Sequence, residues 1–226
     1  MAVNNTVNLH AQNVRIVQIV VANNVLTKTD KMNYNRLRVP ERENPHKEPE
    51  RCFVLQKLIQ KHNLKKGAEL GVRSGELYYF LLSHCPELTL IGVDLYESQP
   101  NGTSDPKRKR TYDQPFMGFS YNHSLYYNFI KELQNEFGTR AQFIKDWTSN
   151  ASLLIEDNSL DFVFIDADHG FDGCSQDIEK WTPKVKSGGF ITGHDIWTSG
   201  VKKAVQKYFG NDYKKYPDHV WIHQKK

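Results

Sequence analysis

The sequence predicts an α/β protein whose mostly parallel sheet is covered by helices on both faces. Three observations point to this fold class. Short strand-like segments alternate with longer segments in which apolar residues recur at helical spacing. The strand-like segments are apolar at nearly every position, as expected when both faces of a sheet are buried. A glycine-rich turn joins the first of these strands directly to a helix.

Length and composition favour an ordinary globular enzyme-sized domain. The 226 residues suffice for one domain with a substantial core, and 38% are hydrophobic and 25% charged. No apolar run approaches the roughly 20 residues of a membrane span. The N-terminus lacks a basic segment followed by an apolar one, so we expect no signal peptide. Three widely spaced cysteines argue against a disulfide framework. We therefore expect a cytoplasmic protein without a membrane partner.

The net charge of +4 is weak for a protein that binds nucleic acid. Basic residues cluster only at 107–110, which we interpret as a solvated loop. Contact with phosphate or another acidic substrate is the alternative for this cluster. Nucleic acid is thus not an expected partner.

Residues 1–49 differ from the rest of the chain and are interpreted as an N-terminal extension. They are rich in Asn, contain one β-branched run at 14–21, and end in a charged, proline-bearing stretch. Such a segment is an arm or a partly ordered extension, and an arm would suit a homodimer. Residues 50–226 carry the alternating pattern and are predicted to form the main domain.

Apolar spacing predicts the elements of this domain in order. The first half is expected to hold a helix through Phe53, Leu58 and Ile59, a strand at 68–72, a helix through Leu77, Phe80 and Leu81, a strand at 88–93, a polar insertion at 97–116, a helix with Leu125, Phe129, Ile130, Leu133 and Phe137 on one face, and a strand at 141–144. The second half is expected to hold a strand at 160–165, a helix through Ile178 and Trp181, a turn at 186–189, a strand at 190–192, a helix through Val201, Ala204, Val205, Tyr208 and Phe209, and a strand at 219–223.

Acidic residues stand where these predicted strands end. Ligands of open parallel sheets bind outside the carboxyl ends of the strands. We therefore expect one edge of the sheet to gather the following acids: Glu69, Asp94, Asp146, Asp166 and Asp195.

The turn from Glu69 to Gly75 indicates the cofactor. Its pattern is E-x-G-x-x-x-G rather than the G-x-G-x-x-G of a pyrophosphate-binding turn, which points away from NAD and toward S-adenosylmethionine (SAM). Gly71 would let backbone approach a ligand, and Gly75 would let the helix pack closely. The turn also contains Arg73 and Ser74, and we expect free N–H groups at the helix start near Ser74 to favour a carboxylate. Glu69 could bind an ammonium. An ordinary strand-to-helix turn is the alternative.

Two further strand ends are expected to hold the rest of this cofactor. Asp94 follows Gly71 by about 20 residues, where an acid can accept both ribose hydroxyls, with Leu95 beside it. Asp146 can accept an adenine amino group while Trp147 covers the ring. A helix-capping role for Asp94 and core packing of Trp147 are the alternatives.

A third group of residues suggests catalysis beside the cofactor. Asp166, His194 and Asp195 could hold a divalent cation such as Mg²⁺. A cation lowers the pKa of a substrate hydroxyl, and His169 could take its proton. Alternatively, Asp168 and His169 cap the next helix and His194 bonds backbone.

These motifs together resemble a known family. From about 64 to 223 the chain is similar to class I SAM-dependent methyltransferases, and most similar to a branch with D-A-D/N-H after the fourth strand and G-G-x-x-x-G-H-D after the fifth. Here these motifs are Asp166-Ala-Asp-His169 and Gly188-Gly-Phe-Ile-Thr-Gly-His-Asp195. The resemblance implies a Rossmann-like, seven-stranded sheet with an antiparallel last strand.

The branch also resembles the Mg²⁺-dependent macrolide-sugar O-methyltransferases. That group has an Asp ligand and a catalytic His three residues apart, which match Asp166 and His169. Two adjacent acids follow its fifth strand, whereas this chain has His194 in place of the first and only Asp195 matches.

We therefore expect SAM-dependent O-methylation of a small-molecule or sugar hydroxyl. N-methylation of a metabolite or macromolecule is one alternative, although the D/N-P-P-Y/F signature typical of many N-methyltransferases is replaced here by Asp166-Ala-Asp-His169. A non-catalytic SAM- or RNA-binding module is another, because aromatic residues near the basic cluster could stack bases. A dehydrogenase fits least, since its third glycine is misplaced.

Overall fold

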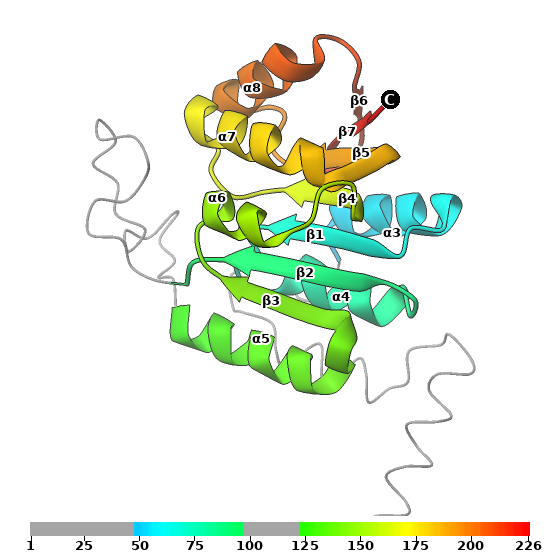
Figure 1. Cartoon of the computed structure of the whole chain (residues 1–226), viewed down its shortest axis with the longest axis vertical. Coiled ribbons are helices and arrows are strands. Elements are labelled where there is room, and N and C mark those ends of the chain that lie inside the picture. Colours follow the sequence, from blue (N-terminus) through cyan, green and yellow to red (C-terminus); the bar gives the residue numbers. More distant parts are fainter. Residues whose placement is uncertain (1–47, 97–122) are drawn as a thin grey trace, which may run out of the picture. The chain divides into compact units, whose positions relative to one another are not determined.

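A computed structural model describes residues 48–96 and 123–226 of this chain. Within them lies a seven-stranded sheet with the order β3-β2-β1-β4-β5-β7-β6 (Figure 1). The first five strands are parallel, while β7 runs antiparallel to both β5 and β6. The expected α/β class, with a mostly parallel sheet and an antiparallel last strand, is confirmed.

The elements follow one another as β-strands joined by helical crossovers. The strands are β1 (Lys66–Leu70), β2 (Thr89–Asp94), β3 (Ala141–Lys145), β4 (Leu160–Ile165), β5 (Val185–Gly193), β6 (Lys214–Lys215) and β7 (Trp221–Gln224). The α-helices are α3 (Glu50–His62), α4 (Glu76–His84), α5 (His123–Phe137), α6 (Thr148–Ala151), α7 (Phe171–Trp181) and α8 (Ser199–Phe209). Short 3₁₀ turns lie at Gly138–Arg140, Ser152–Leu154 and Thr182–Lys184.

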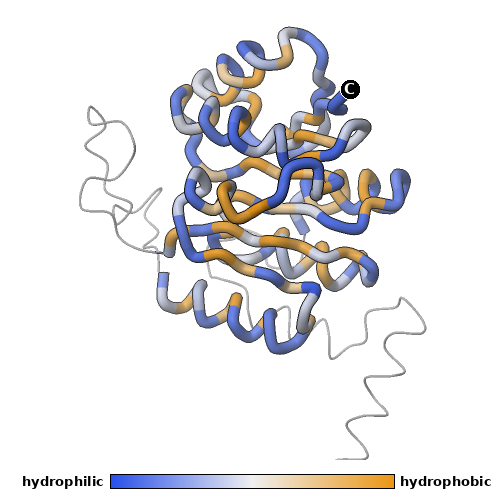
Figure 2. The backbone as a smooth tube through the Cα atoms, viewed as in Figure 1, coloured by the Kyte–Doolittle hydropathy of each residue, from blue (hydrophilic) through white to orange (hydrophobic). Residues whose placement is uncertain are grey.

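Apolar side chains from alternate strand positions cover both faces of the sheet. On one face, strand residues such as Leu70 and Ile165 pack against Cys174 and Trp181 of α7 and Val205 of α8 in one buried cluster. On the other side α3 contacts α4, and α4 packs on α5 through Tyr79. Figure 2 shows hydrophobic residues concentrated along the central strands. This double cover explains why the strands are apolar at nearly every position.

The strand register brings the predicted strand ends into one row. Asp94 pairs with Lys145, Leu70 with both Val93 and Ile165, and Ile165 with Gly193. Backbone hydrogen bonds continue the row beyond the strands, from Gly71 N–H to Val93, from Asp166 N–H to Leu70 and from His194 N–H to Ile165. The residues that follow β1, β2, β3, β4 and β5 therefore share the carboxyl edge of the sheet, as predicted.

Four local predictions were wrong. The expected turn at 186–189 lies inside β5, where Gly188 has a φ of +80° and the register with β4 shifts between Leu160 and Phe162. A bulge of this kind holds extra residues without ending the strand, so a glycine pair did not mark a turn. Helix α4 begins at Glu76 rather than near Ser74. Strand β6 was not predicted, and Leu125 is exposed while Tyr126 is buried.

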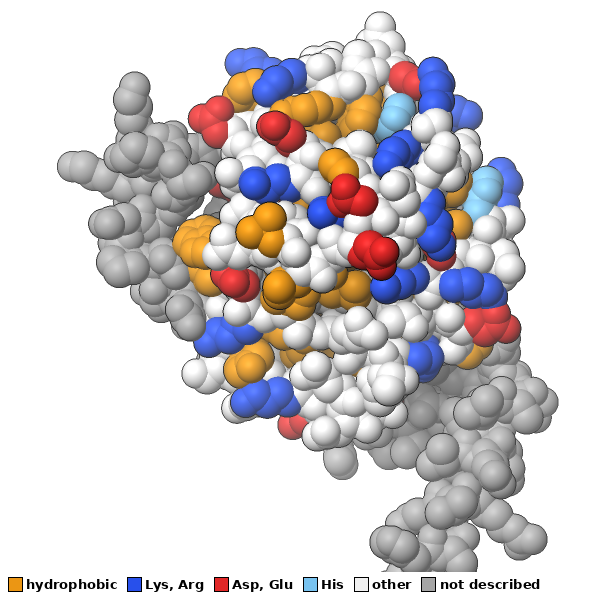
Figure 3. All heavy atoms as spheres, in the orientation of Figure 1, with side chains coloured by type: hydrophobic (Ala, Val, Ile, Leu, Met, Phe, Trp, Pro, Cys, Tyr) orange, Lys and Arg blue, Asp and Glu red, His pale blue; other side chains and the backbone are white. Residues whose placement is uncertain are grey.

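Several predictions lie outside the described residues. They concern nearly all of the 1–49 extension, the insertion at 97–116 and the basic cluster at 107–110. Among the residues that are described, no helix is long and apolar enough to cross a membrane. On the face shown in Figure 3, basic and acidic side chains are interspersed over the described surface.

Candidate active site at the carboxyl edge of the sheet

The glycine turn after β1 is held in a conformation that suits its glycines. Gly71 and Gly75 have φ values of +84° and +78°. A Cβ on Gly71 would lie 2.2 Å from the carbonyl oxygen of Asp166, so this glycine lets the turn pack against the end of β4. A Cβ on Gly75 would lie 3.0 Å from Ile130 and 3.1 Å from Phe129, both on α5. The missing side chain of Gly71 therefore allows close packing, and the approach of its backbone to a ligand stays a prediction.

Glu69 is a buried acid beside this turn. Its side chain is 4% exposed, and its Oε2 atom has no hydrogen-bond partner among the described residues. Burial, followed by the nearby Asp166 carboxylate, raises the pKa of Glu69 well above its usual range. A buried acid with an unsatisfied oxygen is costly for the fold. It fits a donor from a bound ligand, such as the ammonium of SAM.

Asp94 connects the turn to the end of β2. Its Oδ2 atom accepts the Arg73 N–H at 2.8 Å, and its Oδ1 atom accepts the Tyr96 N–H at 3.2 Å. The Tyr96 hydroxyl donates in turn to the Arg73 carbonyl at 2.6 Å. Arg73 thus has both backbone groups fixed at a φ of +51°. A carboxylate offers about four acceptor sites, so Asp94 can hold this turn and still accept ribose hydroxyls; Leu95 follows it, half-buried.

The end of β3 presents an indole at the same edge. Asp146 Oδ1 accepts the Trp147 N–H at 2.6 Å and the Asn150 side-chain amide at 2.9 Å, which fixes the start of α6. Trp147 is 41% exposed, so core packing does not explain it. Its indole is therefore partly exposed at the end of β3.

Two carboxylates and an imidazole meet at the ends of β4 and β5. His169 Nε2 lies 2.8 Å from Asp195 Oδ2 and 3.3 Å from Asp166 Oδ1. One ligand atom from each of these residues lies within 4.8 Å of the other two. A Cβ on Gly200 of α8 would lie 2.2 Å from the His169 carbonyl oxygen, so α8 packs directly behind this histidine. Asp168 accepts the Gly170 N–H at 2.7 Å in the turn before α7, and no side chain caps the start of that helix.

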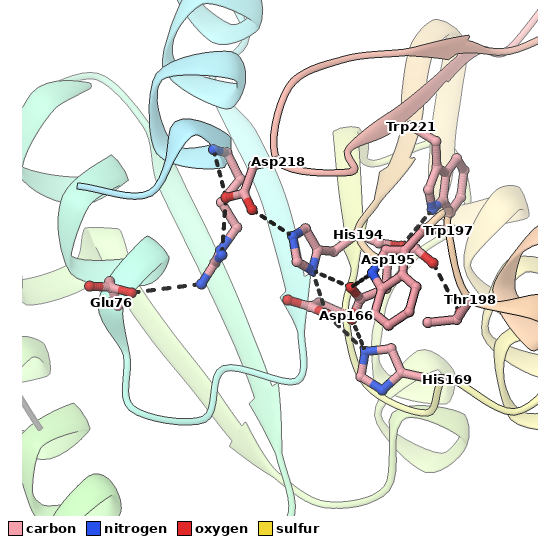
Figure 4. Close-up of polar contacts among 10 residues, drawn as sticks. Glu76, Asp166, His169, His194, Asp195, Trp197, Thr198, Asp218 and Trp221 are labelled. Atoms are coloured by element: carbon pink, nitrogen blue, oxygen red, sulfur yellow. Dashed lines mark hydrogen bonds and ion pairs between the residues drawn. The ribbon is translucent and has the colours of Figure 1, made fainter. Parts of the chain in front are cut away.

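His194 faces the same pair of carboxylates. Its Nδ1 atom lies 3.6 Å from Asp166 Oδ1 and 3.4 Å from Asp195 Oδ1. Its Nε2 atom lies 3.4 Å from Asp218 Oδ1. Figure 4 shows both imidazoles, of His194 and His169, pointing toward Asp166 and Asp195. The alternative in which His194 bonds backbone through its side chain is therefore wrong.

The carboxylates and imidazoles set one another's protonation. Burial alone would raise the pKa of Asp166 and of Asp195, but hydrogen bonds from His169 and His194 outweigh it and hold both pKa values below the usual range. Hydrogen bonds with Asp166 and Asp195 raise the pKa of His169 to about 10. At His194 burial lowers the pKa, but hydrogen bonds with Asp166, Asp195 and Asp218 outweigh it and raise the pKa to about 11. Without a bound cation, two imidazolium charges balance the carboxylates at neutral pH.

This donor set fits a divalent cation. Two carboxylates suit a hard ion such as Mg²⁺ or Mn²⁺, and an imidazole nitrogen extends the range to ions such as Fe²⁺. We predicted Asp166, His194 and Asp195 as ligands and His169 as base. In the structure one ligand atom from each of Asp166, His169 and Asp195 forms a group within 4.8 Å, and His194 Nδ1 lies 3.6 Å and 3.4 Å from oxygens of the same two carboxylates.

Sequence reasoning missed three residues of this site. Trp197 is 67% exposed, and its indole N–H donates to Asp195 Oδ1 at 2.7 Å. Asp218 and Arg51 come from the β6–β7 loop and from α3, far from the motifs in sequence. Trp197 could have been suspected because it follows Asp195 by two residues, whereas nothing in the local pattern marked Asp218 or Arg51.

Comparison with known proteins agrees with this geometry. The model of a protein family described as "Methyltransferase domain" matches residues 68–196, which run from β1 to the loop after β5. Among curated proteins, a sequence search finds no match.

Solved structures with the same fold include three methyltransferases. The O-methyltransferase NovP is 15% identical, with a TM-score of 0.56 over 84% of this chain and 79% of that one. CalS11, a TDP-rhamnose 3′-O-methyltransferase of calicheamicin biosynthesis, is 11% identical, with a TM-score of 0.54 over 98% and 96%. PaMTH1 from Podospora anserina, solved with bound S-adenosylhomocysteine, is 12% identical, with a TM-score of 0.55 over the full length of both chains.

Proposed function

Because this chain belongs to the methyltransferase domain family, we propose that it transfers the methyl group of SAM to a hydroxyl oxygen of a small molecule. One observation carries the choice of a hydroxyl. An imidazole and two carboxylates, from His169, Asp166 and Asp195, stand beside the turn that is expected to bind SAM. A hydroxyl must lose its proton on methylation, and this group can orient it and accept that proton.

The residues around the glycine turn would hold SAM by its charged and polar groups. Glu69, with its unsatisfied buried oxygen, would accept the ammonium. Asp94 would accept the ribose hydroxyls, and Asp146 with Trp147 would receive the adenine. The N-cap of α4 provides no side-chain hydrogen bond, so N–H groups of its first turn can face the carboxylate.

Asp166 and Asp195 would hold a divalent cation, with His194 at its side. When bound, the cation would lower the pKa of the acceptor hydroxyl. It would also neutralise the carboxylates and so lower the pKa of the neighbouring histidines. Asp166 would then orient the acceptor toward the sulfonium methyl. Holding both reactants in line supplies much of the rate.

His169 is the proposed proton acceptor. At 43% side-chain exposure it is the most accessible member of the cluster, whereas the His194 side chain is 12% exposed. A raised pKa makes its imidazole a strong base once its own proton has left. It can therefore reach a substrate oxygen on the open side of the site.

The acceptor is proposed to be a small molecule, with a sugar hydroxyl as one class. The fold shared with NovP and CalS11, both O-methyltransferases, supports a hydroxyl acceptor. We further propose that the protein acts in the cytoplasm and that residues 1–49 form an arm of a homodimer. Gel filtration with light scattering on the full chain would test the dimer, and a monomer at micromolar concentration would contradict it.

The decisive experiment compares His169→Ala with His84→Ala, a control on α4 whose ring contacts Phe80. Both are assayed with methyl-labelled SAM and a panel of sugar and phenolic acceptors. We expect His169→Ala to lower turnover by about 100-fold or more, within the range of general-base catalysis. Its affinity for S-adenosylhomocysteine should stay near that of the wild type. Equal loss of turnover and affinity would contradict the role as base.

A further inference from the structure

The loop between β6 and β7 brings an acid to the back of the site. Asp218 and the next residue, His219, both have a φ of +55°, a left-handed conformation that non-glycine residues rarely adopt. Such backbone costs free energy and persists only where surrounding contacts enforce it. Here it directs Asp218 Oδ1 to within 3.4 Å of His194 Nε2 (Figure 4).

The second oxygen of Asp218 is held by α3. Asp218 Oδ2 accepts the backbone N–H of Arg51 at 3.1 Å and a guanidinium N–H at 3.1 Å. Another guanidinium nitrogen of Arg51 lies 3.7 Å from Glu76 at the start of α4. The two oxygens of Asp218 therefore have different partners, Arg51 for one and His194 for the other.

These contacts leave His194 one arrangement. Its backbone is fixed, because its N–H donates to Ile165 and its carbonyl accepts the Trp221 indole N–H at 3.2 Å. An ionised carboxylate only accepts hydrogen bonds, and the pKa of Asp218 is lowered to about 2, since bonds from His194 and Arg51 outweigh its burial. Nε2 of His194 therefore donates to Asp218 at 3.4 Å, and a ring held there presents Nδ1 to Asp166 and Asp195.

We propose that Asp218 is a positioning residue, which fixes the ring orientation of His194 through its contact with Nε2, and that Arg51 fixes Asp218. The partner on the far nitrogen of an imidazole commonly decides which nitrogen faces a site. The contribution to turnover rests on the proposed function. The effect on the His194 ring does not.

The rival explanation is a purely structural ion pair between α3 and the loop. In that case removing the Asp218 charge would lower the midpoint of thermal unfolding but leave the protonation of His194 as it was. A measurement on the imidazole itself therefore separates the two explanations.

Asp218→Asn provides that measurement. Arg51 presents two N–H donors to the Oδ2 position, so the Asn oxygen should turn to Arg51 and its NH₂ group to His194. Nε2 would then face a donor and lose its proton. Heteronuclear NMR of ¹⁵N-histidine-labelled full-length protein should show this nitrogen changing from protonated to unprotonated. Asp212→Asn, an exposed acid that pairs with Lys226, should leave the His194 signals unchanged.

The outcomes are distinct. An Nε2 that stays protonated in a folded Asp218→Asn variant overturns the proposal. If that variant does not fold, Arg51→Met, which frees Asp218 without removing it, should broaden or shift the same signals, and unchanged signals would again refute it. With an active acceptor, kcat of Asp218→Asn should fall by about 10- to 100-fold at unchanged S-adenosylhomocysteine affinity. Failure to find any acceptor would affect the proposed function and leave the NMR result valid.

Discussion

Asp94 has one observed role and one proposed role, which a single carboxylate can combine. It holds the backbone of the turn through the Arg73 and Tyr96 N–H groups. Burial raises its pKa, although these N–H groups and that of Leu95 act in the opposite direction. Its remaining acceptor sites are the ones proposed to bind ribose.

We expect Asp94→Asn to weaken S-adenosylhomocysteine binding by at least about 10-fold, because two charge-assisted hydrogen bonds to ribose would become weaker. Isothermal titration calorimetry measures this directly. Asp157→Asn is the control, since Asp157, in the loop before β4, pairs with Lys184 in the 3₁₀ turn that follows α7. Equal affinities for the Asp94 variant and the wild type would exclude the ribose role.

Asp177 is a buried acid that the proposed chemistry does not use. It lies on α7, is 2% exposed, and accepts a hydrogen bond from the Thr148 hydroxyl at 2.5 Å. Burial raises its pKa to about 7, partly offset by that hydrogen bond and reinforced by the nearby Asp168. Ionisation of Asp177 is therefore less favourable in the folded protein than in the unfolded chain.

The pH dependence of stability follows from this shift. The folded pKa is above the unfolded value of about 4, so between these values the folded state binds more protons. Its free energy of unfolding therefore falls as pH rises from about 4 to about 7. Asp177→Asn removes this contribution and keeps an acceptor for Thr148. Urea unfolding at several pH values should show the variant gaining on the wild type over that range, and a constant difference would contradict the assignment.

At the scale of elements, the turn between β1 and α4 depends on contact between backbones. Gly71 has no room for a side chain because the Asp166 carbonyl occupies it. Gly138, in the 3₁₀ turn after α5, shares a positive φ but has nothing within 4 Å of an added Cβ. The two glycines therefore separate the cost of backbone conformation from the cost of steric overlap.

We expect Gly138→Ala to lower the free energy of unfolding by about 1–2 kcal/mol, because alanine is strained in a left-handed backbone conformation. Gly71→Ala should cost at least about 2 kcal/mol more, because the ends of β1 and β4 must move apart. Chemical denaturation compares the two variants with the wild type. Similar losses in both would mean that the turn relaxes without disturbing β4.

At the scale of the whole molecule, the site is assembled from both ends of the described chain. Arg51 comes from the first described helix and Asp218 from the last loop, with Asp166, His169 and Asp195 between them. A ligand that binds this site in the folded protein, and does not bind the unfolded chain, should raise the free energy of unfolding of the whole domain.

A divalent cation gives the corresponding test. Mg²⁺ or Mn²⁺ at 100 times its dissociation constant should raise the free energy of unfolding by about 2.7 kcal/mol. Asp195→Asn should lose most of this gain, while Asp157→Asn should keep it. Turnover should fall in the presence of EDTA. Stability and turnover that are both indifferent to cation and chelator would show that the site works through its histidines alone.

Much of the fold could be read from residue patterns. The parallel strands were found because their burial on both faces makes them continuously apolar. The prediction that their acids share one edge needed only the rule that parallel strands end on the same side. Errors arose where a local signal has two meanings, since Gly188 and Gly189 occur in a bulge as readily as in a turn.

The sequence by itself therefore determined the parallel strands and the prediction that Glu69, Asp94, Asp166 and Asp195 share one edge of the sheet. These follow from local periodicity and chain direction. Only the tertiary structure decided which atoms meet: that His169 lies between Asp166 and Asp195, and that Arg51 and Asp218 stand behind His194. Such contacts join residues up to 167 positions apart. They depend on how whole elements pack, which no local pattern encodes.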